Sequence, residues 1–263
     1  MCIIAFAWKK GLEKLILAAN RDEFFSRPTR TASFWDDGKT LAGTDLKHGG
    51  SWLAINRFGR MAAITNYRDP ARIKTGAPSR GSIVIDFVTG TLSPEAFVNK
   101  ALDNASHYNA FNLLMMNRDQ LCYYSNVNRE FRVLDPGIYA LSNHLLDTQW
   151  PKTRKLKMGL QSLVHLDVVD HDSLLTLLGD RELAPDEELP DTGIPKSLEK
   201  SLSSVFISMD DYGTRCSTML TISKTGDTLF TEVSYDQKGE VAQRKEFNFC
   251  MRPQCFEQLW RIA

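Results

Sequence analysis

Residues 2–24 read CIIAFAWKKGLEKLILAANRDEF, which is an apolar strand, a short turn and a second apolar strand that ends in polar residues. Apolar residues with strand-forming side chains fill residues 2–8 and 14–20, so both segments are predicted as strands of one hairpin. In an antiparallel hairpin the end of the second strand lies beside the start of the first. The pattern therefore brings Arg21 and Asp22 within side-chain reach of the first residue of the hairpin.

That first residue, Cys2, directly follows the initiator methionine. Removal of Met1 would put a thiol and a free α-amine on one residue. An α-amine has an unperturbed pKa of about 7.7 to 8.0, so near neutral pH it can accept the thiol's proton directly or through a water. A neighbouring arginine lowers the pKa of a thiol, and a carboxylate can hold an amine in place. The alternative is that Cys2 only packs as a small apolar residue of a buried strand.

The rest of the chain alternates between strand and helix patterns. Strands are predicted at residues 51–56, 60–66, 111–116, 121–125, 131–134, 138–141, 216–222, 228–233 and 245–249, and helices at 80–88, 94–105, 150–163, 172–178 and 254–262. The four strands between residues 111 and 141 suggest an antiparallel meander, and residues 184–195 an exposed loop. We expect an α+β fold in which two antiparallel sheets face each other under outer helices, built as a single domain over residues 1–263.

Composition narrows the class of protein. Lys+Arg and Asp+Glu both number 32, so no overall field attracts the chain to nucleic acid, and small molecules are the expected partners. No apolar run reaches the roughly 18 residues of a membrane span, and the N-terminus lacks the features of an export signal. The five cysteines are odd in number and contain no CxxC pair, which argues against a disulfide framework and a zinc site. We expect a cytoplasmic protein without a membrane span.

The polar end of the hairpin also carries a family resemblance. An N-terminal Met-Cys followed by Ala-Asn-Arg-Asp-Glu-Phe at residues 19–24 resembles the hallmark of the NRDE family, also called the transport and Golgi organisation 2 family. Further blocks similar to those of the family follow in order over residues 1 to about 235. They are AGTD at 42–45, GGSWL at 49–53, GRMAAITNYR at 59–68, LSN at 141–143 and YGTR at 212–215.

The resemblance implies a fold and a function. The family is similar to N-terminal-nucleophile hydrolases of the choloylglycine hydrolase and penicillin V acylase type, which implies a four-layer αββα sandwich. It implies an amidohydrolase or acyl hydrolase that uses Cys2 on a small amide or thioester and requires no cofactor. The alternative is a non-catalytic carrier, because the family is linked to haem trafficking and acyl-coenzyme A homeostasis. Haem would then be a carried ligand in the same cleft.

The resemblance also implies site residues. The catalytic set is Cys2, Arg21, Asp22, Asn66, Asn143 and Arg215, and the substrate- or ligand-binding set is Asn20, Trp52, Tyr67 and His144, with no metal ligands. Cys2 matches the nucleophile, and Arg21 the arginine beside it. Asn66 matches an amide of the oxyanion hole, a suitable task for a fixed neutral donor. Asn143 matches an asparagine that holds the N-terminal residue or substrate, and Arg215 an arginine that closes the site.

One departure from the hydrolase pattern concerns the aspartate. The hydrolases place it three residues after the arginine, whereas Asp22 follows Arg21 immediately. In a strand this change moves the carboxylate to the opposite face, so Asp22 is expected to orient the loop and not the amine. Among weaker candidates, His48 and His144 are considered as lining residues or haem ligands. The basic helix from residue 150, which contains Lys152, is interpreted as a solvated face that could alternatively grip a phosphate group.

Overall fold

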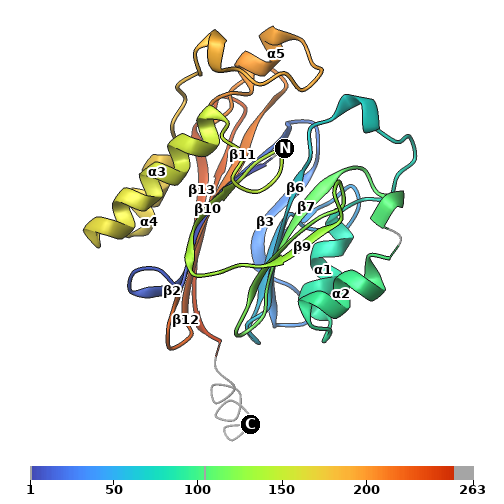
Figure 1. Ribbon diagram of the computed structural model, residues 1–263. Coiled ribbons are helices and arrows are strands. Elements are labelled where there is room, and N and C mark those ends of the chain that lie inside the picture. The colour runs from blue at the N-terminus through green and yellow to red at the C-terminus, as the bar shows by residue number, and fades with distance from the viewer. Residues whose placement is uncertain (1, 104, 252–263) are drawn as a thin grey trace, which may run out of the picture.

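The computed structural model describes residues 2–103 and 105–251, and in these ranges two antiparallel sheets face each other (Figure 1). Sheet A has the order β10 (Gly137–Leu141), β1 (Cys2–Trp8), β2 (Glu13–Phe24), β11 (Tyr212–Ser223), β12 (Asp227–Tyr235) and β13 (Val241–Cys250). Sheet B has the order β3 (Thr29–Phe34), β4 (Thr40–Asp45), β5 (Leu53–Asn56), β6 (Met61–Asn66), β7 (Phe111–Met116), β8 (Leu121–Ser125) and β9 (Glu130–Val133).

Helices cover the outer face of each sheet (Figure 1). Sheet B carries α1 (Gly81–Thr89) and α2 (Pro94–Ala101), sheet A carries α3 (Pro151–Leu166) and α4 (His171–Leu178), and α5 (Lys196–Ser201) follows. The start of α2 matches its sequence signal, since Ser93 accepts a hydrogen bond from the Ala96 N–H and Pro94 opens the first turn. The expected layered α+β architecture, αββα, is confirmed.

Alternation along the strands divides the core into three layers. Phe6 and Leu17 of sheet A pack with Leu114 of sheet B in the cluster between the sheets. Ile3 faces the other way and packs with Leu156 under α3. A third cluster fills the space between sheet B and its helices. Because residues of β1 alternate between two buried faces, its sequence reads as an almost continuous apolar run.

Several predicted elements need correction. The strands β3 and β4 were not among the predicted strands, and they complete sheet B at one edge. The fourth strand of the predicted meander, β10, is not in sheet B but pairs with β1 at the edge of sheet A, with Leu141 opposite Ile4. Pairing between strands so distant in sequence leaves no local pattern in either strand. The helix predicted at 254–262 lies outside the described residues.

Candidate functional site

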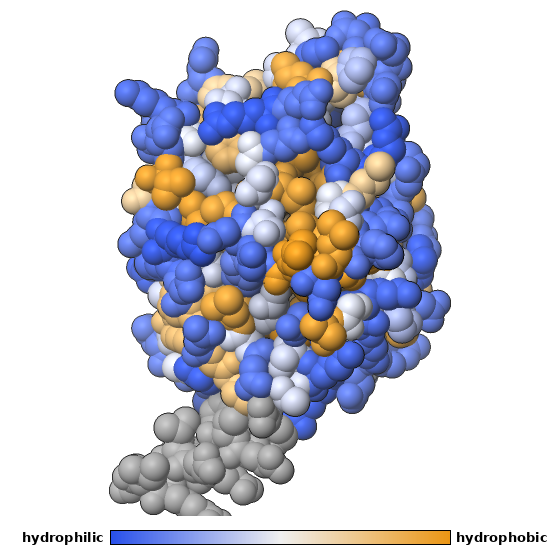
Figure 2. Space-filling view, turned by 90° about the vertical axis from the view of Figure 1, so that its left-hand side faces the viewer, coloured by the Kyte–Doolittle hydropathy of each residue, from blue (hydrophilic) through white to orange (hydrophobic). Residues whose placement is uncertain are grey.

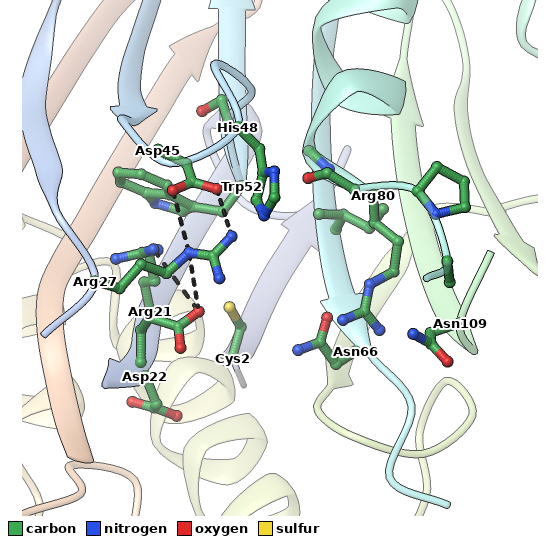
Figure 3. Close-up of a pocket in the computed structure, with 17 residues that line it drawn as sticks. Cys2, Arg21, Asp22, Arg27, Asp45, His48, Trp52, Asn66, Arg80 and Asn109 are labelled. Atoms are coloured by element: carbon green, nitrogen blue, oxygen red, sulfur yellow. Dashed lines mark hydrogen bonds and ion pairs between the residues drawn. The ribbon is translucent and has the colours of Figure 1, made fainter. Parts of the chain in front are cut away.

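A cavity of about 230 Å³ opens between the two sheets, where β1 begins and β2 and β6 end (Figure 3). The sulfur of Cys2 points into the space between Arg27 on one side and Asn66 and Arg80 on the other. The lining residues include Cys2, Arg21, Asp22, Glu23, Arg27, Asp45, His48, Trp52, Asn66, Arg80 and Asn109. The predicted nucleophile therefore lies on an open cavity and not in the apolar interior.

Cys2 is held at the first position of β1 and is half-buried. Its backbone carbonyl accepts a hydrogen bond of 3.1 Å from the Ser142 hydroxyl, which fixes the start of the strand against the end of β10. Burial raises the pKa of the Cys2 thiol, and the charge of Asp22 acts in the same direction. Arg21 and the backbone N–H of Asp22 oppose this change. The thiol therefore needs an adjacent base to lose its proton near neutral pH.

Arg21 lies opposite Cys2 in the register of β1 and β2, as the hairpin predicts. Its guanidinium stacks on the Trp52 ring at 4.3 Å, donates a 3.1 Å hydrogen bond to Thr29 Oγ1 and lies 3.9 Å from a Glu23 carboxylate oxygen. A glycine at position 43 makes room for this stack, because a Cβ there would overlap the Trp52 ring. The cation beside the thiol is thus fixed from three sides.

Asp22 directs its carboxylate away from the sulfur of Cys2 (Figure 3). It is buried, and Thr214 Oγ1 donates a 2.8 Å hydrogen bond to its Oδ1. The Tyr212 hydroxyl donates to the Asp22 backbone carbonyl at 2.9 Å. Burial raises the pKa of the Asp22 carboxyl, and the charge of Lys152 is the foremost effect that opposes it. This direction agrees with the alternation of side chains along a strand, whereas the expected role of Asp22 in orienting the loop stays a prediction.

The two predicted asparagines occupy different positions. The Asn66 side chain faces the cavity across from Cys2 (Figure 3). Asn143 is fully buried, and its Nδ2 donates a 3.0 Å hydrogen bond to the backbone carbonyl of Asn66. Ser142 Oγ lies 3.3 Å from Asn143 Oδ1, so its one proton is shared between this oxygen and the Cys2 carbonyl. Asn143 therefore holds the backbone at the end of β6 in place. The side chain of Asn66 is the one that a ligand in the cavity would contact.

Arg215 supports the loop after β2. It is the extra residue of a bulge in β11, between Thr214 opposite Asp22 and the next paired residue. Its Nη1 donates to the backbone carbonyls of Phe24 and Arg27 at 2.8 and 3.2 Å. Arg215 is absent from the described lining of the cavity, and it shapes one wall by holding the segment that carries Arg27.

The predicted binding residues divide into two groups. Trp52 lines the cavity, and Tyr67 lines an adjoining compartment of about 370 Å³. The ring of His144 lies 4.8 Å from that of Tyr67 and supports it from outside. Asn20 faces the helices: its Nδ2 donates to the Leu178 carbonyl at 2.9 Å, and its Oδ1 accepts from the Ser217 hydroxyl at 2.6 Å. We assign no ligand contact to Asn20.

The adjoining compartment shares Asn66, Arg80 and Asn109 with the cavity. Beyond these residues its walls become apolar, with Ile194, Leu198 and Leu202 among the lining side chains. A polar hollow at Cys2 and a more apolar one therefore border on the same three residues. No group of three or more His, Cys, Asp or Glu side chains suited to a metal ion occurs in the described part of the chain.

Sequence reasoning did not single out Arg27 and Arg80. Arg27 forms a two-point ion pair with Asp45, with N–O distances of 3.1 and 2.6 Å. Arg80 precedes α1 and donates a 2.9 Å hydrogen bond to the Ala110 carbonyl. Its place beside the cavity depends on a glycine at position 50, where a Cβ would overlap the backbone of Gly81. The glycine pair in the sequence was the available signal for this close approach.

The interpretation of α3 as a basic solvated face was wrong for Lys152, which is buried. Arg154 and Lys155 are exposed but paired with acidic residues, Arg154 with Glu188. Figure 2 shows apolar side chains among hydrophilic ones on this side of the molecule, and Met158 of α3 is 60% exposed. The helix thus presents a mixed surface outside and buries one lysine inside. None of the helices in residues 2–103 and 105–251 is long and apolar enough to cross a membrane.

Comparison with known proteins agrees with this architecture. The family model described as Transport and Golgi organisation 2 matches residues 1–237. The Transport and Golgi organization protein 2 homologs of Bos taurus and Homo sapiens are each 36% identical to the chain, over 89% and 90% of its length and 93% and 94% of theirs. The Drosophila melanogaster protein is 28% identical over 88% of this chain and 91% of its own.

Solved structures resemble the chain in fold. A C2A mutant of the conjugated bile acid hydrolase from Clostridium perfringens superposes with a TM-score of 0.51 at 10% sequence identity. The match covers 94% of this chain and 92% of that structure. The two antiparallel sheets between helices are therefore the fold of an N-terminal-nucleophile hydrolase, at a sequence similarity that identifies the fold alone.

Proposed function

Because the chain belongs to the Transport and Golgi organisation 2 family and has the fold of an N-terminal-nucleophile hydrolase, we propose that it is an acyl hydrolase that uses Cys2 on small amides or thioesters. The observation that carries the proposal is the arrangement at the cavity, where the Cys2 thiol lies beside Arg21 and across from the Asn66 amide. This set combines a nucleophile, a cation and a neutral hydrogen-bond donor.

The reaction begins after Met1 is removed. The α-amine of Cys2 takes the proton of the thiol, and the thiolate attacks the carbonyl carbon of the substrate. The electron pair of the carbonyl bond moves to oxygen, where Nδ2 of Asn66 donates a hydrogen bond to the oxyanion. When the oxyanion collapses, the bond to the leaving amine or thiol breaks, and the leaving group takes the proton from the ammonium.

The product of this first half is an acyl group bound to Cys2 as a thioester. The same α-amine then takes a proton from a water molecule, and the hydroxyl attacks the thioester carbonyl. Collapse of the second oxyanion releases the carboxylic acid and breaks the carbon–sulfur bond. The sulfur recovers a proton from the ammonium, so the enzyme returns to its starting state.

The two compartments support an acyl substrate. The leaving group would occupy the polar chamber that Arg27 and His48 line, and the acyl chain would extend past Asn66 toward Ile194 and Leu198. A scissile bond at the boundary would lie between Cys2 and the Asn66 amide. Apolar surface in the second compartment would then contribute affinity in proportion to the chain length buried there.

Turnover measurements test the proposal against the carrier alternative. Wild-type protein is expected to hydrolyse S-decanoyl-N-acetylcysteamine or decanoyl p-nitroanilide, and Cys2→Ala is expected to abolish this turnover. A second variant, with a lysine inserted between Met1 and Cys2, keeps the methionine and is expected to lose turnover while it still binds the substrate. Undiminished hydrolysis by Cys2→Ala would contradict the proposal.

A carrier would behave differently in the same experiment. It would show no turnover, and Cys2→Ala would bind haem or an acyl-coenzyme A as well as the wild type does. His48 lines the cavity whereas His144 lies behind Tyr67, so haem bound beside Cys2 would lose its axial ligand in His48→Ala and not in His144→Ala. Absorbance titration with haem separates these outcomes.

A further inference from the structure

A buried lysine lies behind the hairpin, on the side of sheet A that α3 covers. Lys152 is the second residue of α3, and only 3% of its surface is exposed. It precedes Leu156 and Leu160 at spacings of four residues, so it belongs to the stripe of α3 that packs on sheet A. Its Nζ atom is buried and has no hydrogen-bond partner among the residues that the structure describes. A buried ammonium in this state depends on nearby opposite charges.

The charged side chains around Lys152 come from three segments, which are β2, the residues after β6, and α5. Asp22 lies two residues before the end of β2 and is 1% exposed, while Arg68, from the segment after β6, donates a 2.5 Å hydrogen bond to Glu199 of α5. Asp22 and Glu199 both stabilise the charged form of Lys152, and Arg68 disfavours it. Two cations and two anions therefore balance behind Cys2. Arg68 and Glu199 are joined to each other, and Lys152 is the foremost charge that favours the ionised form of Asp22.

The position of Asp22 allows its carboxylate to approach the α-amine of a processed Cys2 although it faces away from the sulfur. Arg21 is paired with Cys2, so the next residue of β2 lies beside the point where the chain enters β1. The α-amine of a processed Cys2 is a backbone group in the plane of the sheet. A carboxylate on the α3 side can approach it without crossing the strand.

We propose that Lys152 is a positioning residue for Cys2: its ammonium keeps the Asp22 carboxylate ionised, and that carboxylate holds the α-amine of the processed Cys2 and stabilises the ammonium that forms when the amine takes the thiol's proton. The inference rests on the proposed function, since only a chain without Met1 has this ammonium. Burial lowers the pKa of Lys152 to about 8, followed by the effect of Arg68, while Asp22, Cys2 and Glu199 oppose the change. The Lys152 ammonium therefore loses its proton in the pH range in which a cysteine thiol ionises.

The test follows the thiol and needs no turnover. Alkylation of Cys2 by iodoacetamide is measured as a function of pH by peptide mass spectrometry in wild type, K152M and K152R. The matched control is K155M, because Lys155 is exposed on the same helix and pairs with Asp180 and Glu182. We expect K152M to move the midpoint upward by about half a pH unit or more, since without the Lys152 ammonium Asp22 takes up a proton and no longer holds the terminal ammonium that stabilises the thiolate. K152R and K155M should match the wild type.

A second set of variants tests whether Lys152 acts through Asp22. In a D22N background, K152M should produce no further shift of the midpoint. An unchanged profile in K152M, or the same shift in both backgrounds, would overturn the proposal. If K152M folds poorly, D22N/K152M should have a higher unfolding temperature than K152M, because D22N removes the buried carboxylate that has lost the charge of Lys152; an equal or lower temperature would count against the coupling of the two residues. Absence of acyl hydrolysis with these alkylation results would contradict the catalytic function alone.

Discussion

Cys2 and Arg21 stand directly opposite each other on β1 and β2, and both line the cavity between the sheets. The guanidinium is fixed on the Trp52 ring, so its charge acts on the thiol from a constant position. Burial raises the pKa of the Cys2 thiol, and Arg21 is one of the groups that limit this increase. The pair thus places a desolvated thiol beside a cation that stabilises its ionised form.

Replacement of this cation should slow reactions of the thiol. We expect Arg21→Met to lower both the alkylation rate of Cys2 at neutral pH and kcat/KM about tenfold, which corresponds to roughly one pKa unit. The measurement is the pH dependence of alkylation followed by mass spectrometry. Arg30→Met is the control, because Arg30 is an exposed arginine of the neighbouring β3. Equal rates in Arg21→Met and the control would refute the assigned role.

Asn66 should matter for the transition state more than for binding. We expect Asn66→Ala to reduce kcat about 10²- to 10³-fold with little change in KM, because a lost oxyanion donor stabilises only the transition state. Asn143→Ala should have a smaller effect on kcat, since Asn143 acts on the Asn66 backbone. Steady-state kinetics on an acyl thioester measure both. A mainly KM effect in Asn66→Ala would make Asn66 a binding residue.

The apolar compartment should set the preferred chain length. Leu198→Trp narrows this compartment on the side of α5, far from the Cys2 thiol. We expect kcat/KM for a decanoyl thioester to fall about tenfold, and that for an acetyl thioester to stay unchanged. Parallel kinetics on the two substrates provide the ratio. A uniform loss on both substrates would mean that the acyl chain does not enter this compartment.

His171 should make the fold sensitive to acid. Its imidazole is hydrogen-bonded to Thr231 and Thr221 hydroxyls at 2.7 and 3.3 Å. Burial lowers the pKa of His171 to about 4, Arg244 acts in the same direction and the acidic Glu246, Asp170 and Asp172 oppose it. The unfolded chain therefore binds this proton first as the pH falls, and the folded state loses stability between about pH 6.5 and 4.

The free energy of unfolding should decrease by about 3 kcal/mol across this range because of His171 alone. Urea unfolding at several pH values, compared between wild type and His171→Gln, isolates the contribution. We expect a flatter pH dependence in the variant. Parallel curves for the two proteins would show that the imidazole does not remain neutral in the folded state.

Local patterns in the sequence predicted the hairpin and much of the site. The register between Cys2 and Arg21 follows from two apolar strands and one short turn, and the opposite face of Asp22 follows from the alternation of side chains along a strand. These features depend on residues close in sequence. The same reasoning placed Asn66 at the end of a strand, where the structure brings it to the cavity.

Features that depend on distant pairing were not predictable in the same way. The strands β3 and β4 have short sequences with small and polar residues, TRTASF and TLAGTD, whose strand character comes from their neighbours. β10 joins sheet A by pairing with the side of β1 that β2 leaves unpaired. Lys152 carried a readable signal, its spacing from Leu156, but its charge favoured the solvated interpretation.

The central claim is that Cys2, freed from Met1, forms a covalent acyl intermediate. The most direct measurement is the intact mass of the protein before and after rapid mixing with S-decanoyl-N-acetylcysteamine, followed by peptide mapping. The account predicts a mass lower by one methionine residue before mixing, and a decanoyl thioester on Cys2 afterwards that decays as decanoate appears. Retention of Met1 in protein that turns over the substrate, or turnover without acylation of Cys2, would contradict it.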